Sequence, residues 1–350
     1  MSTKSVKIKN IRIGGGERIA VQSMTNTDTL DAEATGEQLK ALQLAGCDIA
    51  RIAVSSDGEA NAAKSLIGKF DMPLVADIQF DYRLAVKCCE IGFDKIRFNP
   101  GNIGDESKVK YLVDCCKVHG TPIRIGVNTG SLEREFKGEK PSDALVKSAL
   151  KHVALLERFG FYDIVISVKS SDVKTTVEAY RKLSSSVDYP LHVGVTEAGT
   201  ELRGITRSAI GIGALLLDGI GDTVRVSLSG DPVNEVEAAR LILQEAGIDK
   251  CFCQIVSCPT CSRCKYDLKS IVDELKAVTK DIRVPVKVAV MGCVVNGPGE
   301  AADADFGVAG GGAGKAALFV AGKTVKTINT SEIIPELKKL IDMKVAEYER

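Results

Sequence analysis

The cysteines of this 350-residue chain gather toward its end, at spacings that could hold a metal. Cys258 and Cys261 form a C-x-x-C pair, and Cys264 follows three residues later. Cys293 stands in a second loop, which a Gly-Pro-Gly turn bends tightly. Two cysteines three positions apart can bring both sulfurs to one metal centre. The pair and the second cysteine loop together predict a metal centre in the last third of the chain.

Zinc and iron–sulfur centres are both candidates for this pattern. A structural zinc site usually joins two paired cysteine knuckles, and only Cys251 and Cys253, at an awkward spacing, could supply the second pair. An iron–sulfur cluster accepts one C-x-x-C pair with remote ligands. Spacing alone nominates four thiolates, those of Cys258, Cys261, Cys264 and Cys293. A reactive cluster, however, needs one iron with a replaceable ligand, and Glu300 at the end of the second loop is a candidate for that oxygen ligand.

The other cysteines stand among apolar residues, so we expect them to be small buried hydrophobic side chains. They are Cys47, Cys88, Cys89, Cys115 and Cys116. Residues 1–10 are polar and basic without an apolar centre, which is not the pattern of a secretory signal. No apolar run reaches the ~18–20 residues that cross a bilayer. We therefore expect a cytoplasmic protein that enters no membrane and keeps its thiols reduced.

Polar side chains recur inside or just after the apolar runs of the first two thirds of the chain. They are Arg51, Asp77, Arg97, Asn99, Arg124, Asn128, Ser167, Lys169, His192, Thr196, Glu197, Arg225 and Ser227. Four arginines and one lysine at one place would repel each other unless an anion lay among them, and a diphosphate matches the forked guanidinium group. Each arginine could instead pair with a nearby acid such as Asp48, Asp77 or Asp94. Glu197, a carboxylate among these cations, could give or take a proton.

Alternating strands and helices must position these side chains. Apolar residues at three- and four-residue intervals predict helices such as 31–45, 105–118, 143–158, 173–183 and 234–246. Short apolar runs predict eight strands, centred on residues 19–22, 49–54, 74–78, 95–98, 122–127, 164–168, 191–195 and 223–228. Eight such units favour an α/β fold, a closed (β/α)8 TIM barrel, whose active sites lie where the strands end. An open doubly wound sheet is the alternative, but no G-x-G-x-x-G follows the first strand.

After residue 247 the pattern of elements changes. The sequence predicts a substrate-binding barrel over residues 1–247 and a smaller α+β domain, which holds the metal centre, over residues 248–350. In the second domain, the cysteine-rich stretch 251–264 precedes a helix at 268–279 and an apolar strand at 284–291. A glycine-rich stretch, which we expect to form turns between short strands, leads to a final amphipathic helix at 331–349.

Several long strings in the sequence are more specific than any single motif. They are VQSMTNT at 21–27, VADI at 75–78, IRFNPGN at 96–102, IRIGVN at 123–128, GVTEAG at 194–199, CPTC at 258–261 and CVVNGPGE at 293–300. In this order they resemble the 4-hydroxy-3-methylbut-2-enyl diphosphate synthase family, the reductive enzymes of the methylerythritol phosphate route to isoprenoids. The resemblance covers essentially the whole chain and is to the compact two-domain form of the family.

The resemblance implies a [4Fe-4S] cluster, and so favours Glu300 over Cys264 as the fourth ligand. The implied ligands are Cys258, Cys261, Cys293 and Glu300. The implied reaction is two-electron reductive opening and dehydration of 2-C-methyl-D-erythritol 2,4-cyclodiphosphate to 4-hydroxy-3-methylbut-2-enyl diphosphate, with Glu197 as the catalytic proton donor. The implied substrate-binding residues are Arg51, Asp77, Arg97, Asn99, Arg124, Asn128, Ser167, Lys169, His192, Arg225 and Ser227.

The resemblance also implies partners: a flavodoxin or ferredoxin as electron donor, and a second copy in a head-to-tail homodimer. Basic and acidic residues are equal in number, 46 of each, and there is no tryptophan, so the composition speaks against a nucleic-acid partner or a membrane surface. Two alternatives remain: a pterin-type barrel transferase with a structural metal domain, and a non-enzymatic zinc module for contact with protein or RNA.

Overall fold

The computed structural model describes residues 3–99, 105–136, 138–196, 199–249, 252–295, 299 and 301–348. The chain divides into two compact units, Met1–Ala246 and Gly247–Arg350, and each unit has a hydrophobic core of its own. Within these described ranges, no helix is both long enough and apolar enough to cross a membrane.

Eight parallel strands form the centre of the first unit. They are β3 (Ala20–Met24), β4 (Ile49–Ala53), β5 (Leu74–Asp77), β6 (Lys95–Phe98), β7 (Ile123–Asn128), β8 (Ile164–Lys169), β9 (His192–Val193) and β10 (Thr223–Val224). Their hydrogen-bonded order is β8-β7-β6-β5-β4-β3-β10-β9, and one parallel bridge between Ile166 and Leu191 brings β8 beside the start of β9. The sheet is therefore a nearly closed TIM barrel, which confirms the predicted fold class.

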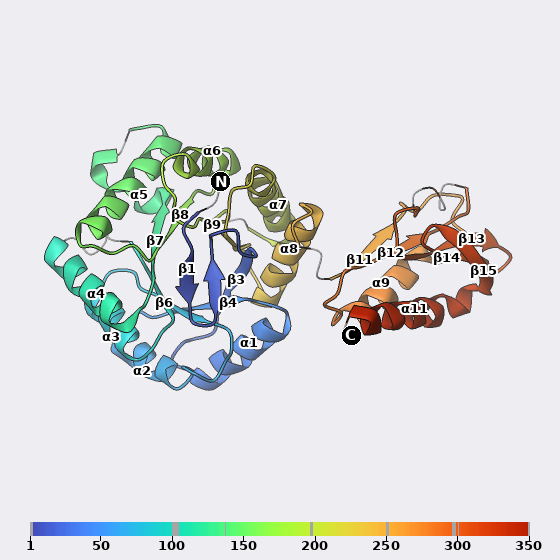
Figure 1. Cartoon of the computed structure of the whole chain (residues 1–350), viewed down its shortest axis with the longest axis horizontal. Coiled ribbons are helices and arrows are strands. Elements are labelled where there is room, and N and C mark those ends of the chain that lie inside the picture. The colour runs from blue at the N-terminus through green and yellow to red at the C-terminus, as the bar shows by residue number, and fades with distance from the viewer. Residues whose placement is uncertain are drawn as a thin grey trace. The chain divides into compact units, whose positions relative to one another are not determined.

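Helices alternate with these strands and surround them (Figure 1). They are α1 (Ala32–Leu44), α2 (Asp57–Lys64), α3 (Tyr82–Glu90), α4 (Glu106–His119), α5 (Pro141–Arg158), α6 (Val173–Ser184), α7 (Glu201–Leu217) and α8 (Pro232–Glu245), with short 3-10 turns η2 (Thr129–Ser131) and η3 (Arg134–Phe136) after β7. Most of these helices begin at an aspartate or serine whose side chain accepts a hydrogen bond from a backbone N–H of the first turn, which satisfies a donor that the helix leaves unpaired. Asp81, Asp105 and Asp172 are examples.

A short hairpin before the barrel was not foreseen. Its strands, β1 (Val6–Ile8) and β2 (Ile11–Ile13), pair antiparallel. Ile8 and Ile13 are fully buried against residues at the beginnings of the barrel strands. The hairpin therefore closes the end of the barrel where the strands start, and the end where they finish stays available for a site.

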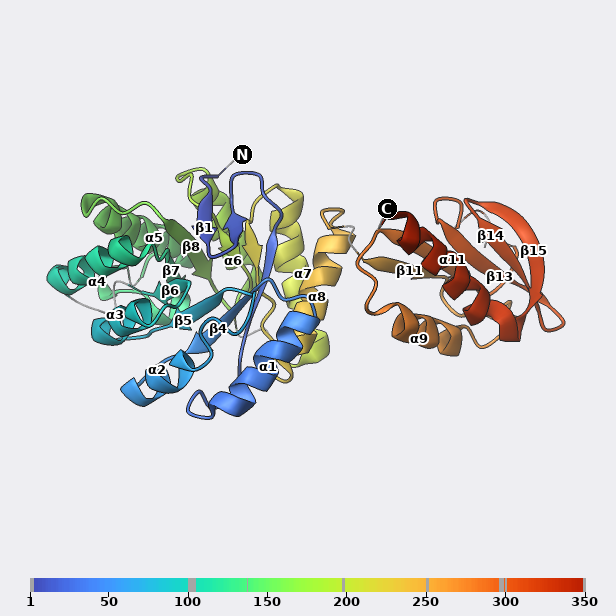
Figure 2. The same cartoon turned by 60° about the horizontal axis from the view of Figure 1, so that its bottom comes forward.

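A mixed five-stranded sheet forms the second unit, as the predicted α+β domain requires. Its elements are β11 (Cys253–Ser257), α9 (Leu268–Thr279), β12 (Val286–Met291), β13 (Phe306–Gly312), β14 (Lys315–Val320), β15 (Lys323–Asn329), the turn η4 (Thr330–Glu332) and α11 (Ile333–Tyr348). The strands β11, β12 and β13 are parallel neighbours, and β14 and β15 continue the sheet antiparallel. The helices α9 and α11 pack together on one face of this sheet, with Leu275 and Leu337 in the shared core (Figure 2).

The glycine-rich stretch of this unit differs from the expected turns. Gly307, Gly310 and Gly312 lie inside β13, and only the short link before β14 is a turn. At Gly307 and Gly310 a side chain would collide with the backbone of the neighbouring strand or loop. Glycine therefore lets the strand lie close to its neighbours here.

Candidate active site

Inward-facing side chains of the barrel strands place a group of cations in its interior. The strand residues that alternate with them, such as Ile125 and Ile166, pack outward against the helices. Branched apolar side chains usually fill such an interior, so this charge indicates a binding function. The charges of the inward cations act on one another, which shows that they lie together. These cations are Arg51, Lys95, Arg97, Arg124, Lys169 and Arg225.

Asp77, at the end of β5, holds two of these cations. Its carboxylate oxygens lie 2.8 Å from Nη1 of Arg97 and 3.5 Å from Nε of Arg51. Burial alone would raise the pKa of Asp77, but the guanidinium groups of Arg51 and Arg97 outweigh it and lower that pKa to about 2. Asp77 is therefore ionised and fixes the orientation of both arginines. The other two acids considered from the sequence, Asp48 and Asp94, do not take this role: Asp48 pairs with Arg18 and Arg240, and Asp94 accepts from the backbone N–H of Leu74.

Glu235, in the first turn of α8, pairs with a third cation and was not predicted from the sequence. Its carboxylate lies 3.3 Å from Nη2 of Arg225, and it also accepts hydrogen bonds from the Ser23 hydroxyl at 2.8 Å and from the Leu228 backbone N–H at 3.0 Å. The signal that could have found Glu235 is an acid in the first turn of the helix that follows the strand bearing Arg225. Its buried charge positions the guanidinium group at the strand ends.

Arg124 and Lys95 are fully buried cations with incomplete hydrogen bonding. Among the described residues, neither Nε nor Nη2 of Arg124 has a hydrogen-bond partner, and neither has Nζ of Lys95. Burial, followed by the neighbouring arginines, lowers the pKa of both groups well below their ordinary values, and burial followed by Arg124 does the same for Lys169. Such desolvated positive charge is costly unless an anion compensates it. An anion in the interior of the barrel would supply the missing hydrogen-bond partners and compensate this charge.

Two glycines leave room for these long side chains. A Cβ atom at Gly126 would lie 2.5 Å from Nε of Arg97, and one at Gly194 would lie 2.8 Å from Nζ of Lys169. Gly194 also approaches the backbone of the neighbouring strand, since its Cβ would meet the carbonyl oxygen of Arg225 at 2.4 Å. Both glycines lie in sequence strings that resemble the family. A larger residue at either position would collide with a cation of the cluster.

His192 is fully buried beside the cations. Its Nδ1 lies 2.7 Å from the Thr223 hydroxyl oxygen. Burial, with the charges of Lys169 and Arg124 adding to it, lowers the pKa of His192 well below its ordinary value. The imidazole is therefore neutral here, so it can offer a hydrogen bond to a ligand but no positive charge.

Of the remaining positions proposed from the sequence, four lie near the ends of barrel strands and one lies outside the described residues. Asn99 follows β6, Asn128 ends β7 and Ser167 lies near the end of β8, so these side chains belong to the same end of the barrel as the cations, and Ser227 follows β10. Ser167 donates to the Ile125 carbonyl at 3.4 Å. Glu197, the proposed proton donor, lies outside the described residues.

Two cysteines of the second unit lie at the carboxyl ends of neighbouring strands of its sheet. Cys258 directly follows β11, and Cys293 follows β12 by two residues. These strands are parallel neighbours, with Ser257 opposite Val290, so both cysteines lie at the carboxyl ends. The backbone N–H of Gly292 donates to Cys258 Sγ at 3.2 Å, and that of Lys265 donates to the Gly292 carbonyl at 2.9 Å. The two cysteine loops are therefore tied together by backbone hydrogen bonds.

The surroundings of these cysteines suit thiolate ligands of a metal centre. A backbone N–H aimed at a ligand sulfur, as at Cys258, is the kind of contact that tunes an iron–sulfur cluster. The backbone and side chain of Arg263 donate to Cys261 and lower the pKa of its exposed thiol. Glu300 lies outside the described residues.

Cys264 has other contacts. Its Sγ lies 3.1 Å from the Tyr266 carbonyl oxygen, to which the thiol donates. A Cβ atom at Gly292 would lie only 2.6 Å from the same sulfur, so Cys264 packs tightly beneath the second loop. In this structure the thiol therefore contacts its own loop through Tyr266 and lies close to Gly292 of the second loop.

The family comparison decides between the alternatives for the chain. Residues 3–240 match the family description "GcpE TIM-barrel domain", and residues 254–343 match "GcpE protein C-terminal domain". The chain belongs to the GcpE family. One relative, from Caldanaerobacter subterraneus, is 54% identical over 349 residues, which cover 99% of this chain and 98% of that protein. Another, from Clostridium perfringens, is 53% identical over 343 residues, which cover 97% of this chain and 98% of that protein. Both relatives are named 4-hydroxy-3-methylbut-2-en-1-yl diphosphate synthase (flavodoxin).

Solved structures resemble the GcpE barrel at the level of the fold alone. A dihydropteroate synthase of Yersinia pestis matches with a TM-score of 0.50 at 14% identity, over 70% of this chain and 100% of that one. A 7,8-dihydropteroate synthase of Vibrio fischeri matches with a TM-score of 0.51 at 14% identity, over 70% of this chain and 98% of that one. At such identity the shared barrel carries no information on the reaction.

Proposed function

We propose that this GcpE-family chain opens and dehydrates 2-C-methyl-D-erythritol 2,4-cyclodiphosphate reductively, and so makes 4-hydroxy-3-methylbut-2-enyl diphosphate. In the balanced reaction two electrons and two protons enter, the cyclic diphosphate opens at a ring C–O bond, and one water leaves. The observation that carries the proposal is a desolvated group of cations inside a barrel, in a chain whose second unit presents cysteines at the carboxyl ends of two neighbouring strands. The division of labour follows: the barrel, residues 1–247, binds the substrate, and residues 248–350 hold the redox centre.

Substrate binding rests on the buried guanidinium groups. Arg124 lacks hydrogen-bond partners at two of its nitrogens within the described part of the chain, so a phosphate oxygen can take them. Arg51 and Arg97 are already oriented by Asp77, and Arg225 by Glu235, so little ordering entropy is lost when the diphosphate enters. The remaining groups near the strand ends would donate hydrogen bonds or add charge. They are Asn99, Asn128, Ser167, Lys169, His192 and Ser227.

Cys258, Cys261, Cys293 and Glu300 would hold a [4Fe-4S] cluster. When bound, such a cluster supplies single electrons and an iron that can accept an oxygen ligand from the substrate. The chain's own part is to present the three thiolates from two loops tied by the Gly292 backbone, and to supply N–H donors to the sulfurs. Glu300 completes the set with a carboxylate oxygen, a weaker ligand than a thiolate, while Cys264 keeps its contact with the Tyr266 carbonyl.

Glu197 is the proton donor in this proposal. In the chain it follows β9 by a few residues, and a carboxyl group can give or take a proton according to its surroundings. The proton it gives would leave with the departing hydroxyl group as water. His192 is neutral and would orient the substrate through a hydrogen bond, without giving a proton.

Electrons would reach the cluster from a flavodoxin, the donor class in the names of the relatives, or from a ferredoxin. We also propose a head-to-tail homodimer that works in the cytoplasm, where thiols stay reduced. A groove of about 500 Å³ between α7 and α8, lined by apolar residues such as Ile205, Leu217 and Leu241, offers the barrel an apolar surface for contact with a second copy.

The test is turnover by anaerobically purified enzyme, with iron and sulfide counted on the same sample. The cyclodiphosphate and a chemical reductant should yield the open diphosphate and water, and product should disappear when the reductant is left out or the cluster is removed. A pterin-type transferase would instead act without electrons and survive loss of the cluster. Zinc without sulfide in the purified protein would point to the non-enzymatic zinc module and would defeat the proposal.

A further inference from the structure

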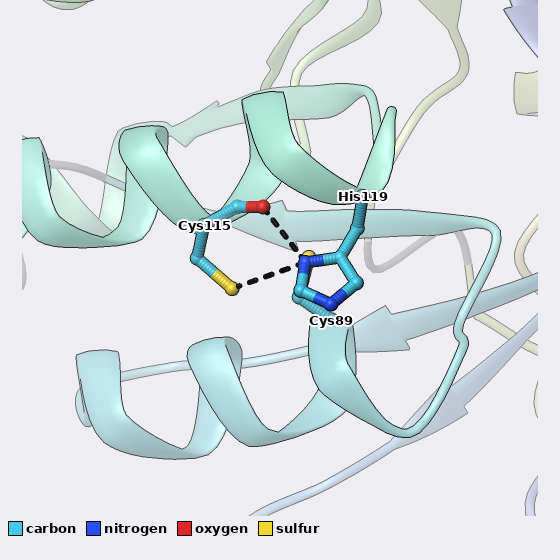
Figure 3. Close-up of side chains that lie close together, drawn as sticks. All are labelled: Cys89, Cys115 and His119. Carbon is cyan, nitrogen blue, oxygen red and sulfur yellow. Dashed lines mark hydrogen bonds between the residues drawn. The ribbon is translucent and has the colours of Figure 1, made fainter.

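A second group of metal-ligating side chains lies between α3 and α4, far along the chain from the cysteines of the C-terminal unit. Cys89 is in the last turn of α3, and Cys115 and His119 are in the last turn of α4 (Figure 3). The potential ligand atoms of these three residues all lie within 4.8 Å of one another. Among the residues that the structure describes, no other three histidine, cysteine, aspartate or glutamate side chains come as close.

The spacing of these atoms fits one tetrahedral ion. Cys115 and His119 are four residues apart, so they project from the same face of α4. Cys115 Sγ lies 3.6 Å from His119 Nδ1. Zinc bound at ~2.3 Å to sulfur and ~2.0 Å to nitrogen, at a tetrahedral angle, holds those two atoms about 3.5 Å apart. The pair on α4 therefore already has the separation that a shared zinc ion requires, and Cys89 supplies the third ligand from α3.

The surroundings favour a cation. Both helices end here, and the carboxyl end of a helix carries partial negative charge. Glu90 is the last residue of α3, and its carboxylate acts on Cys115. His119 is exposed and Cys115 is half-buried, so an ion can reach them from solvent. A contact with Thr121 fixes the position of the buried Cys89, since its Sγ lies 3.3 Å from the Thr121 hydroxyl oxygen.

The location separates this group from the substrate chemistry. Crossover helices run opposite to the strands of a parallel barrel, so α3 and α4 end at the face where β6 and β7 begin. The cations that would bind the diphosphate face the interior of the barrel, whereas α3 and α4 lie outside its strands (Figure 1). A metal here can stabilise the α3–α4 pair, but it cannot touch the reacting substrate.

We propose that Cys89, Cys115 and His119 bind a zinc ion, with a fourth position open to solvent. Binding requires both thiols to lose their protons. It also requires His119 to carry its proton on Nε2, so that the contact of Nδ1 with the Cys115 carbonyl oxygen, now 2.9 Å, is exchanged for the metal. The ion would cross-link the ends of two neighbouring helices and so stabilise the barrel.

The test uses the full chain with its iron–sulfur cluster in place, so that the C-terminal thiols are occupied. The protein is stripped of loose metal under anaerobic conditions and titrated with zinc against a chromophoric chelator. Wild type should bind one zinc ion per chain. His119→Ala should lower the zinc affinity by at least about 100-fold, because loss of a ligand costs more than loss of a residue that only supports one. His119 is exposed, so this change should not disturb folding, and Cys115→Ser should act in the same direction. Cys47→Ser is the matched control, because it removes another buried thiol of the barrel.

Thermal unfolding gives an independent measurement, because a ligand that binds only the folded state raises its stability. Zinc should raise the melting temperature of wild type and of Cys47→Ser, but not that of His119→Ala. Equal zinc affinity in wild type and His119→Ala would overturn the proposal, as would cluster-loaded wild type that binds no zinc. A disulfide between Cys89 and Cys115 in the anaerobically purified protein would also overturn it, since it would consume both thiolates.

Discussion

The barrel and the C-terminal unit both place reactive groups at the ends of parallel strands, but they hold these groups by different means. In the barrel, the cations stand on the strands and side-chain carboxylates orient them, as Asp77 does for Arg51 and Arg97. In the C-terminal unit, Cys258 and Cys293 stand just after the strands, in loops tied by backbone hydrogen bonds at Gly292. The first arrangement is set before any ligand arrives. In the second arrangement, the thiols would gain their remaining contacts only from a bound metal centre.

This difference has consequences for stability. Burying like charges in the barrel costs free energy that an anionic ligand would recover, so the barrel gives up stability for a preorganised site. The cysteine loops carry no comparable electrostatic cost, but a metal bound to their thiols would add to their order. Substitutions in the barrel should therefore change ligand affinity and pH dependence. Substitutions among the cysteines should change cofactor content, with less effect on the barrel.

The largest effect should come from Cys293→Ser. Loss of one thiolate should release the cluster or leave it severely unstable, so turnover should fall below detection, while the barrel still binds the cyclodiphosphate. Iron and sulfide counts, a turnover assay and titration calorimetry with the substrate measure these three quantities. An enzyme with Cys293→Ser that keeps full activity would contradict the ligand assignment.

Arg124→Met should have the next largest effect. It removes a fully buried guanidinium group, and truncation of one member of a buried charge pair costs ~2–5 kcal/mol, so substrate affinity should fall by about 30-fold or more. The free energy of unfolding without substrate should stay the same or rise, because an uncompensated buried charge is gone. Arg158→Met, which breaks a surface ion pair with Glu106, is the control. Unchanged substrate affinity in Arg124→Met would show that Arg124 does not bind the anion.

Asp77→Asn tests how the barrel holds its cations as the pH changes. The pKa of Asp77 is lowered from 3.8 to about 2 by folding, so its carboxylate contributes stability above pH 3.8 that is lost as the pH falls through 2. A shift of this size corresponds to ~2 kcal/mol. Between about pH 4 and pH 2, wild type should therefore lose ~2 kcal/mol more unfolding free energy than Asp77→Asn. Urea unfolding of both proteins across this range measures the difference, and parallel pH profiles would show that Asp77 is not stabilised as an anion.

Cys264→Ser should have the smallest effect. The serine hydroxyl can keep the hydrogen bond to the Tyr266 carbonyl, and Cys264 is not one of the proposed ligands, so iron content and turnover should stay within about twofold of wild type. Loss of both would make Cys264 the fourth ligand in place of Glu300.

The repeated pattern of apolar runs was enough to predict the barrel, because each of the eight runs overlaps one of its strands. The runs at residues 191–195 and 223–228 were expected to be full strands, but β9 and β10 each have only two residues. The N-terminal hairpin was missed, because each of its three-residue strands is too short to show a period. The other cations were predicted from their positions in or just after the apolar runs. Lys95 was overlooked, although it lies two residues before Arg97 on the same strand and alternation places both side chains on one face.

The sequence by itself determined the class of fold and the residue types that meet at the strand ends, because alternation along a strand and the order of strands and helices are local properties. Only the tertiary structure decided which acid holds which cation, since Glu235 reaches Arg225 from a following helix and Asp77 bridges two strands. The same holds for the thiols outside the C-terminal unit. Cys89 and Cys115 were expected to be ordinary buried cysteines, and nothing local in the sequence brings them to His119. The packing of α3 against α4 does, because side chains far apart in the chain become neighbours only when their helices pack together.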